Sequence, residues 1–177
     1  MKDRIEIVAS GFGGQGVVRL GQIIGEAGVE QGLHVTMLKS HGTEMRGGYV
    51  RSQVVLSREL IDSPMCESPD YLIALSSAAY NRFKDTVADY GLIIYDPAFV
   101  EKIDDNLKCS QKEFPAKRLS IENFESPLFA NSLVLGFIVR HVDILEEKIA
   151  LKSLLKVMPK FHDRNRDAFM IGAEYEG

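Results

Sequence analysis

The chemistry that the sequence suggests most directly is phosphate binding by a glycine-rich turn near the amino terminus. The turn reads Gly11-Phe12-Gly13-Gly14-Gln15-Gly16, it follows an apolar run, and a helical pattern begins at Val17. Its Gly-x-Gly-x-x-Gly spacing is typical of dinucleotide-binding turns, where backbone N–H groups at a helix amino terminus face a phosphate. Residues 13–17 are therefore a candidate phosphate site, although a strand-to-helix turn that binds nothing would have the same sequence.

The residues after the second predicted strand disfavour NAD as the ligand. An NAD site has Asp or Glu roughly 20 residues beyond the glycines, at the end of that strand, where it binds the ribose hydroxyls. This chain has Leu38-Lys39-Ser40-His41 there, and its next acidic residue is Glu44. Lysine and serine are compatible with a 2′-phosphate. Two hypotheses therefore stay open, a stand-alone NADP-dependent Rossmann-like protein and a stand-alone module that binds an anionic metabolite such as coenzyme A.

A second polar and glycine-rich segment, 40–48, contains groups able to contact a ligand or a partner. It offers an imidazole, a carboxylate, a planar cation and a flexible glycine pair: His41, Gly42, Glu44, Arg46, Gly47 and Gly48. Glycines allow backbone conformations that are closed to other residues. Two interpretations stay open: a surface connection held by its own Glu44–Arg46 pair, and a loop that becomes ordered against a neighbouring chain through charge-assisted contacts.

The composition indicates one ordinary globular domain over residues 1–177. Hydrophobic residues make up 45% and charged residues 26%, and the net charge of -4 gives no sign of nucleic-acid binding. No apolar run reaches the roughly 18 residues of a membrane span, and the amino terminus lacks a secretory signal, so we expect a cytoplasmic protein. Cys66 and Cys109 lie far apart and form no Cys-x-x-Cys, so we expect the chain to hold neither an iron–sulfur cluster nor another metal.

The elements that must position these residues follow from the hydrophobic pattern. Apolar runs predict strands at 5–9, 34–39, 49–57, 71–75 and 92–95, an edge strand at 113–119, and helices at 15–31, 77–91, 128–141, 146–158 and 161–175. Arg58-Glu59 is expected to reverse the chain into 60–64 as a β-hairpin. The sequence therefore predicts an α/β fold, namely a Rossmann-like three-layer sheet with helices on both faces, one β-hairpin and a helical carboxyl-terminal segment.

The first predicted helix carries a stripe of small residues, Gly21, Gly25 and Gly28. Glycine inside a helix costs about 1 kcal/mol relative to alanine. Three such residues on one stripe indicate close packing against a sheet or a partner, and we expect self-association on this ground.

Several segments together resemble one family. Gly11–Val17 is similar to the G-x-G-G-Q-G-V opening of the gamma subunit of 2-oxoacid:ferredoxin oxidoreductases, and Gly42-x-Glu44-x-Arg46-Gly47-Gly48 is similar to its second signature. Further likenesses follow along the chain: Ser57, Ile61, Pro64, the segment from Asp70 to Leu75, Ala130-Asn131, Leu135-Gly136, and Asn165-x-x-Ala168. The short form of the chain most resembles the 2-oxoglutarate type. Ser40-His41-Gly42-Thr43 departs from the Ser-Tyr-Gly-Pro of many relatives, which leaves the role of His41 open.

The resemblance implies a subunit of an enzyme that oxidatively decarboxylates a 2-oxoacid, such as pyruvate or 2-oxoglutarate, to an acyl-CoA. Such complexes use thiamine diphosphate, Mg, iron–sulfur clusters and coenzyme A, with alpha, beta and ferredoxin-like delta subunits as partners and ferredoxin as the electron acceptor. This chain lacks the Gly-Asp-Gly motif of thiamine sites. We therefore expect it to be inactive alone, without catalytic residues of its own, and needed for assembly. Gly11 and Gly13–Val17 are the candidate contact with a phosphate or coenzyme A, and His41–Gly48 and Asn131 are expected to shape a loop or an interface.

Overall fold

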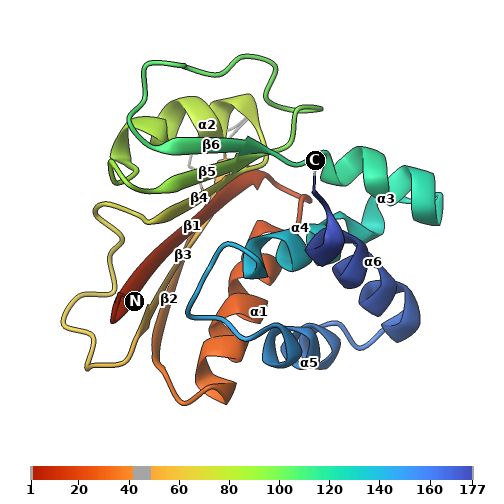
Figure 1. Ribbon diagram of the computed structural model, residues 1–177, viewed down its shortest axis with the longest axis horizontal. Helices are drawn as coiled ribbons and strands as arrows, with labels where there is room; N and C mark the ends of the chain where they lie inside the picture. Colours follow the sequence, from red (N-terminus) through yellow and green to blue (C-terminus); the bar gives the residue numbers. More distant parts are fainter. Residues whose placement is uncertain (1, 42–48, 177) are drawn as a thin grey trace.

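The computed structural model describes residues 2–41 and 49–176, which form one mixed sheet with helices on both faces (Figure 1). Within these residues the strand order is β2-β3-β1-β4-β5-β6. β1, β4, β5 and β6 are parallel, whereas β3 runs antiparallel to both β1 and β2. The strands are β1 Arg4–Phe12, β2 His34–His41, β3 Tyr49–Ser57, β4 Tyr71–Ala74, β5 Leu92–Tyr95 and β6 Ser110–Glu113. The predicted α/β class is confirmed.

The helices form two unequal layers on the sheet (Figure 1). One face carries α2 with the short 3-10 helix η1, and the other carries α1, α4, α5 and α6, with α3 and the 3-10 helix η2 packed beside α4. Their bounds are α1 Val17–Glu30, α2 Ser77–Phe83, η1 Lys84–Thr86, α3 Ala116–Phe124, η2 Pro127–Phe129, α4 Ala130–Val139, α5 Glu147–Val157 and α6 His162–Glu174. The helical carboxyl-terminal segment and the helices on both faces are therefore as predicted.

β1 is a central strand and its side chains divide the core in two. Because successive side chains of a strand point to opposite faces, Ile7 and Ala9 enter the larger core under α1 and α4, while Val8 enters the smaller core under α2. Ile73 and Leu72 of β4 divide in the same way. Burial on both faces explains why the parallel strands read as continuous apolar runs.

The predicted hairpin at Arg58-Glu59 is wrong, because residues 60–64 form no strand. The hairpin of this sheet consists instead of β2 and β3, in which Met37 lies opposite Val54. The other edge of β3 pairs with β1, so no edge of β3 is left for residues 60–64. The Arg4 guanidinium holds the displaced segment, donating to the Asp62 carboxylate and to the Ser63 carbonyl oxygen, both at 3.0 Å.

Two other elements differ from the predicted pattern. The helix predicted at 77–91 ends at Phe83, and Tyr90, within the predicted range, is 68% exposed. The predicted strand at 113–119 is wrong beyond its first residue, since β6 ends at Glu113 and α3 begins at Ala116. Pro115 has no N–H group for a sheet ladder and stands at the position before the first helical residue, so it ends one element and starts the next.

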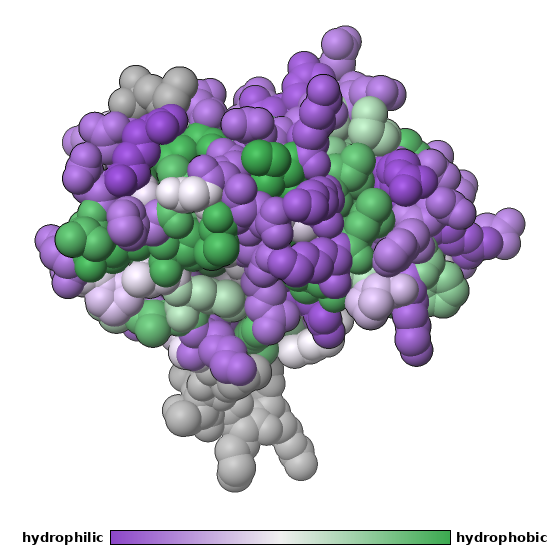
Figure 2. Space-filling model, turned by 90° about the horizontal axis from the view of Figure 1, so that it is seen from below, coloured by the Kyte–Doolittle hydropathy of each residue, from purple (hydrophilic) through white to green (hydrophobic). Residues whose placement is uncertain are grey.

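One face of the molecule carries both hydrophilic and hydrophobic residues (Figure 2). Seen from below the view of Figure 1, apolar residues form separate patches between hydrophilic ones (Figure 2). Among the helices that the described residues form, none has both the length and the apolar composition that crossing a bilayer requires.

The small-residue stripe of α1 packs against this chain's own sheet. A Cβ at Gly21 would overlap Ser52 of β3, and one at Gly28 would overlap Leu56 of β3 and Val35 of β2. Gly25 has more room, since its nearest neighbour would lie 3.6 Å from a Cβ. The stripe is therefore explained by an internal contact, and it gives no support to self-association, which stays a prediction.

α4 and α6 approach each other backbone to backbone. All residues of α4 from Ser132 to Val139 are buried, as expected for a helix that is apolar on every side. A Cβ at Gly136 of α4 would overlap the carbonyl group of Phe169, and a Cβ at Gly172 of α6 would overlap that of Leu133. The two glycines therefore set the distance between the helices.

Gly136→Ala is expected to lower the free energy of unfolding by about 1–3 kcal/mol, because the added methyl group meets backbone atoms that have no freedom to rotate aside. Gly25→Ala is the matched control inside α1, where the methyl group fits and helix propensity should raise the free energy of unfolding by up to about 1 kcal/mol. Denaturant unfolding followed by circular dichroism measures both. Equal effects of the two substitutions would contradict the packing described for α4 and α6.

Candidate functional site

The glycine turn lies at the carboxyl end of β1 and leads into α1. Gly14 and Gly16 have φ values of 91° and 74°, a region that favours glycine, so two of the predicted residues are required by the backbone. Gly16 is the residue before α1, and no side chain caps that end of the helix. Val17 is buried in the core, so only its backbone N–H can serve a ligand. The turn thus presents backbone donors, as the sequence predicted.

Gln15 holds the turn together instead of facing a ligand. Its Oε1 atom accepts from the Phe12 N–H at 2.6 Å, and its Nε2 atom donates to the Leu75 carbonyl oxygen at 2.7 Å. Gly11 leaves the space for this side chain, because a Cβ there would overlap Oε1. The glycine spacing therefore has a structural reason in part, because Gly11 and Gln15 attach the turn to the end of β4.

Asn131, at the start of α4, lies directly against the glycine turn. A Cβ on Gly16 would overlap its carboxamide nitrogen. The Asn131 carboxamide makes no hydrogen bond with any other part of the described chain, and it lines the same cavity as Gly14 and Gly16. The structure thus brings together two of the predicted motifs, which lie far apart in the sequence.

A cavity of about 660 Å³ lies over this turn, at the carboxyl ends of β1, β4 and β5. Ligands of open α/β sheets bind at this end of the strands. The walls come from the turn, the ends of β4 and β5, the start of α3, and η2 and α4: Gly14, Gln15, Gly16, Arg19, Leu75, Asp96, Phe99, Ala116, Lys117, Ser126, Pro127, Leu128, Ala130, Asn131, Val134 and Met158. We call it the glycine-turn cavity, and its lining is mainly apolar.

Two cations stand in the wall of the glycine-turn cavity. The Arg19 guanidinium donates to the Val157 carbonyl oxygen at 3.0 Å, and the Lys117 ammonium lies 4.9 Å from the centre of the Phe99 ring. Neither forms a salt bridge with a carboxylate of the described residues. An apolar cavity with two cations and a row of backbone N–H groups suits an anionic ligand that has an apolar body.

Asp96 is a polar residue of this cavity that the sequence analysis did not single out. It is only 3% exposed, and its oxygens accept the N–H groups of Ala98 and Lys117, each at 2.9 Å. Burial raises the pKa of the Asp96 carboxyl above its usual range, while the two hydrogen bonds and the Lys117 charge oppose that rise. Because both oxygens are engaged, Asp96 fastens the start of α3 to the end of β5 and is not a free acid or base. The Asp-Pro pair after a buried strand was the available signal.

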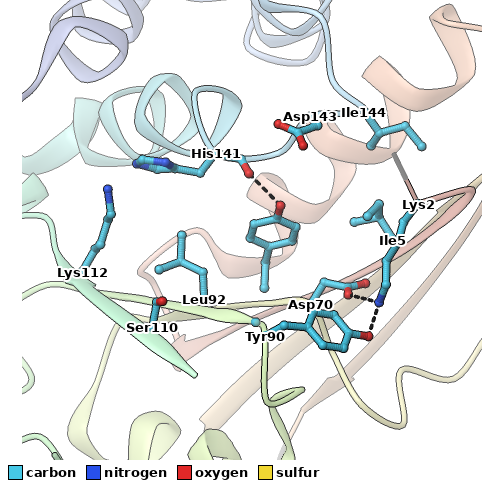
Figure 3. Close-up of a pocket in the computed structure, with 12 residues that line it drawn as sticks. Lys2, Ile5, Asp70, Tyr90, Leu92, Ser110, Lys112, His141, Asp143 and Ile144 are labelled. Atoms are coloured by element: carbon cyan, nitrogen blue, oxygen red, sulfur yellow. Dashed lines mark hydrogen bonds and ion pairs between the residues drawn. The ribbon is translucent and has the colours of Figure 1, made fainter. Parts of the chain in front are cut away.

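A second cavity, of about 310 Å³, lies at the amino ends of the parallel strands (Figure 3). On one side Lys2 forms a salt bridge with Asp70 at 2.7 Å and contacts Tyr90. The Tyr71 hydroxyl, also in the wall of this cavity, donates to the His141 carbonyl oxygen at 2.6 Å. Most of its polar groups therefore satisfy one another.

The His141 imidazole lies in the wall of that second cavity. Burial, with the nearby charges of Lys112 and Arg140, lowers the pKa of His141. This cavity also lies at the opposite end of the strands from the glycine turn. The glycine-turn cavity is therefore the better candidate.

The second predicted signature lies almost wholly outside the described residues. Gly42, Glu44, Arg46, Gly47 and Gly48 fall in 42–48. His41 is the last residue of β2 and lies opposite Val50, while Phe12 at the end of β1 lies opposite Tyr49. His41 and Tyr49, the residues on either side of the segment, thus lie at the same end of the strands as the glycine turn.

The cysteines do not form a cluster or metal site. Cys66 and Cys109 are both free thiols, and burial raises the pKa of the Cys66 thiol to about 12. Within residues 2–41 and 49–176, no group of three or more His, Cys, Asp or Glu side chains could hold a metal ion. The donor set of the described chain therefore does not fit an iron–sulfur cluster.

Comparison with known proteins gives one consistent family. The family model described as pyruvate ferredoxin/flavodoxin oxidoreductase matches residues 6–175. The 2-oxoglutarate synthase subunit KorC of Methanocaldococcus jannaschii is 34% identical over 178 residues, covering 98% of this chain and 95% of its own length. The gamma subunit of a keto/oxoacid ferredoxin oxidoreductase from Geobacter sulfurreducens superimposes with a TM-score of 0.85 at 28% identity, covering 96% of both chains.

These matches cover the glycine turn, the sheet and the carboxyl-terminal helices together. The chain therefore belongs to the pyruvate ferredoxin/flavodoxin oxidoreductase family. Within that family it is a gamma subunit of the 2-oxoacid:ferredoxin oxidoreductase type.

The contact between the turn and α4 predicts an energetic coupling. Gly16→Ala should lower the free energy of unfolding by roughly 1–3 kcal/mol, since the methyl group overlaps Asn131 and the φ of 74° is strained for alanine. In an Asn131→Ala background the overlap disappears and only the backbone cost remains. A double-mutant cycle should therefore give a coupling of about 1 kcal/mol. Gly13→Ala, which points into open space, is the control, and a coupling near zero would remove Asn131 from the turn.

Proposed function

We propose that this chain is the gamma subunit of a 2-oxoglutarate:ferredoxin oxidoreductase, which converts the 2-oxoacid oxidatively to an acyl-CoA. The observation that carries the proposal is the match to the KorC subunit of a 2-oxoglutarate synthase, which covers nearly the full length of both chains. The metal-binding and cluster-binding side chains available in this chain favour a non-redox role in this reaction. The described residues offer neither a cluster-binding set of thiolates nor a metal site.

In this proposal the cofactor chemistry belongs to the partner subunits. Thiamine diphosphate with Mg and the iron–sulfur clusters are held by alpha, beta and delta chains, and ferredoxin removes the electrons. The part of this chain is to complete the assembly and to contact coenzyme A. Its single domain over residues 1–177 then acts as one packed unit of the complex.

A stand-alone NADP-dependent reductase is the weaker alternative. In a dinucleotide fold the residue that reads the ribose follows the strand beside β1. Here β3 stands between β1 and β2, so the end of β2, with Lys39 and Ser40, lies two strand spacings from the glycine turn, roughly 10 Å. That distance places Lys39 poorly for a 2′-phosphate whose pyrophosphate sits on the turn.

The isolated chain is expected to show no 2-oxoacid-dependent reduction of ferredoxin, because no described group of its own can pass electrons. Mixing it with the alpha, beta and delta subunits should restore the reaction, with a higher kcat/KM for 2-oxoglutarate than for pyruvate. Ferredoxin reduction under anaerobic conditions measures both. Full activity of the other three subunits without this chain would contradict the proposal, and so would activity of this chain alone.

The glycine-turn cavity is the proposed contact with coenzyme A. Three features support this assignment: the backbone N–H groups of Gly13, Gly14, Gly16 and Val17, the Lys117 and Arg19 cations, and the Asn131 carboxamide without an internal partner. The Gln15 N–H donates to the Phe12 carbonyl oxygen at 3.2 Å and is not among these donors. Helix amino termini and cations stabilise phosphate groups. The apolar lining, with Phe99 and Val134, suits the less polar arm of the coenzyme.

Lys117→Met is expected to raise the KM for coenzyme A in the complete complex about tenfold or more, since a charge-assisted hydrogen bond contributes roughly 1.5–3 kcal/mol. The KM for the 2-oxoacid should not change, and Lys117→Arg should restore most of the affinity. Lys148→Met, which removes an exposed lysine at the start of α5, is the matched control. Gly13→Val is a second variant. Because the space around residue 13 is open, the valine side chain should fit without disturbing the fold while it blocks access of coenzyme A to the N–H groups of the turn. An unchanged KM in both variants would remove the turn from this role.

A further inference from the structure

An apolar groove adjoins the glycine-turn cavity on its outer side. This second hollow, of about 300 Å³, shares Arg19, Leu128 and Met158 with the first. We call it the α5–α6 groove, and its lining is Arg19, Leu128, Phe129, Met158, Pro159, Lys160, Phe161 and Asn165. Leu128 and Phe161 are 53% and 56% exposed, which is a large exposure for apolar side chains this close together.

Phe161 has an unfavourable backbone conformation, and its side chain is exposed to solvent. Its φ of 58° and ψ of 44° lie in the left-handed region, which a bulky side chain rarely adopts. Its ring touches Phe129 only edge-on, with ring centres 6.1 Å apart. Because the ring is left over half exposed, its burial within this chain offsets little of the cost of the backbone conformation.

Asn165 fixes the turn that presents Phe161. It is 1% exposed, its Nδ2 atom donates to the Lys160 carbonyl oxygen at 2.8 Å, and its Oδ1 atom accepts from the Ser132 hydroxyl of α4 at 2.8 Å. Its own N–H donates to the Phe161 carbonyl oxygen at 2.9 Å. Asn165 is thus a positioning residue that holds the turn in a single conformation against α4.

The rim of the α5–α6 groove is basic. Lys160, Arg164 and Arg19 make no salt bridge with any carboxylate among residues 2–41 and 49–176. Arg164 lies over the Phe129 ring at 6.0 Å. On the same helix Asp163 is paired with Arg166 at 3.1 Å, and Asp167 is an exposed acid that forms no salt bridge among the described residues. A partner that carries carboxylates around an apolar side chain would complement this rim.

We propose that the α5–α6 groove is the docking site for a segment of another subunit of the same oxidoreductase complex, which inserts an apolar side chain beside Phe161 and Leu128 and presents acidic residues to Lys160, Arg164 and Arg19. The proposal rests on the function proposed above. A second copy of this chain is a poor occupant, because a symmetric contact through this face would bring the same three cations together.

The test separates docking from folding by means of the strained residue itself. Phe161→Gly removes the ring and relieves the backbone, since glycine adopts the left-handed region freely, so its Tm should equal or exceed that of the wild type. The Kd for the assembled alpha, beta and delta subunits, measured by biolayer interferometry, should rise at least tenfold. Phe161→Tyr keeps the ring and should bind as the wild type does. Leu60→Ala, which removes an 83% exposed side chain from the segment after β3, is the control and should leave the Kd unchanged.

A charge-reversal variant tests the rim independently. Lys160→Glu combined with Arg164→Glu should weaken assembly at least tenfold and flatten its dependence on salt concentration. Lys148→Glu at the far end of α5 should do neither.

Three other outcomes would contradict docking of another subunit in the α5–α6 groove. If Phe161→Gly assembles as tightly as the wild type, the proposal is wrong. If the wild type alone forms a dimer that Phe161→Gly dissolves in sedimentation experiments, while assembly is unchanged, the occupant is a second copy. If only the affinity of the isolated chain for coenzyme A falls, the occupant is the coenzyme. A wild-type chain that does not bind the other subunits at all would instead contradict the proposed function.

Discussion

The close backbone contact between α4 and α6 is the constraint on which both surface features depend. Gly136 and Gly172 let the two helices approach so closely that a Cβ at either position would overlap a backbone carbonyl group of the other helix. This fixes the start of α4, so that Asn131 lies against Gly16, and it fixes α6, so that Asn165 reaches the Ser132 hydroxyl. The wall of the glycine-turn cavity and the turn of the α5–α6 groove are therefore two consequences of one packing contact. A small change in the spacing of these helices would alter both.

The insertion of β3 between β1 and β2 changes what the glycine turn can bind. The turn has the spacing of a dinucleotide site, and its positive φ values at Gly14 and Gly16 are those of a tight strand-to-helix connection. The strand beside β1, however, is β3, which runs antiparallel to it. Tyr49 at the start of β3 therefore lies beside the turn, in the place where a dinucleotide fold has the end of β2. What remains of the dinucleotide geometry is the phosphate-binding part, without the ribose-binding part. The glycine turn therefore keeps the backbone geometry of a phosphate site, although β3 and not β2 is the strand beside β1.

The sequence predicted those features that depend on neighbours along the chain. Periodic apolar residues gave the buried strands and the helices at the carboxyl terminus, and the glycine spacing gave the turn. It placed the hairpin wrongly, because the choice of β2 and β1 as partners of β3 depends on contacts between distant segments. For the same reason it did not reveal that Asp96 would fasten α3, or that Gln15 would bond to Leu75. A polar side chain that the sequence suggests for ligand binding can instead form hydrogen bonds within the chain, and only the folded structure shows which side chains do so.

The distribution of satisfied and unsatisfied groups around the glycine turn argues for a subunit that shapes a site more than one that transfers protons. Gln15 and Asp96, the two polar side chains closest to a chemical role, have their oxygens engaged in hydrogen bonds to the backbone. The groups left for a ligand are the backbone donors of the turn, two cations and the Asn131 carboxamide. Cations and fixed hydrogen-bond donors of this kind stabilise charge and orient a ligand. A surface of this kind agrees with the membership of this chain in a family of oxidoreductases that includes multi-subunit complexes.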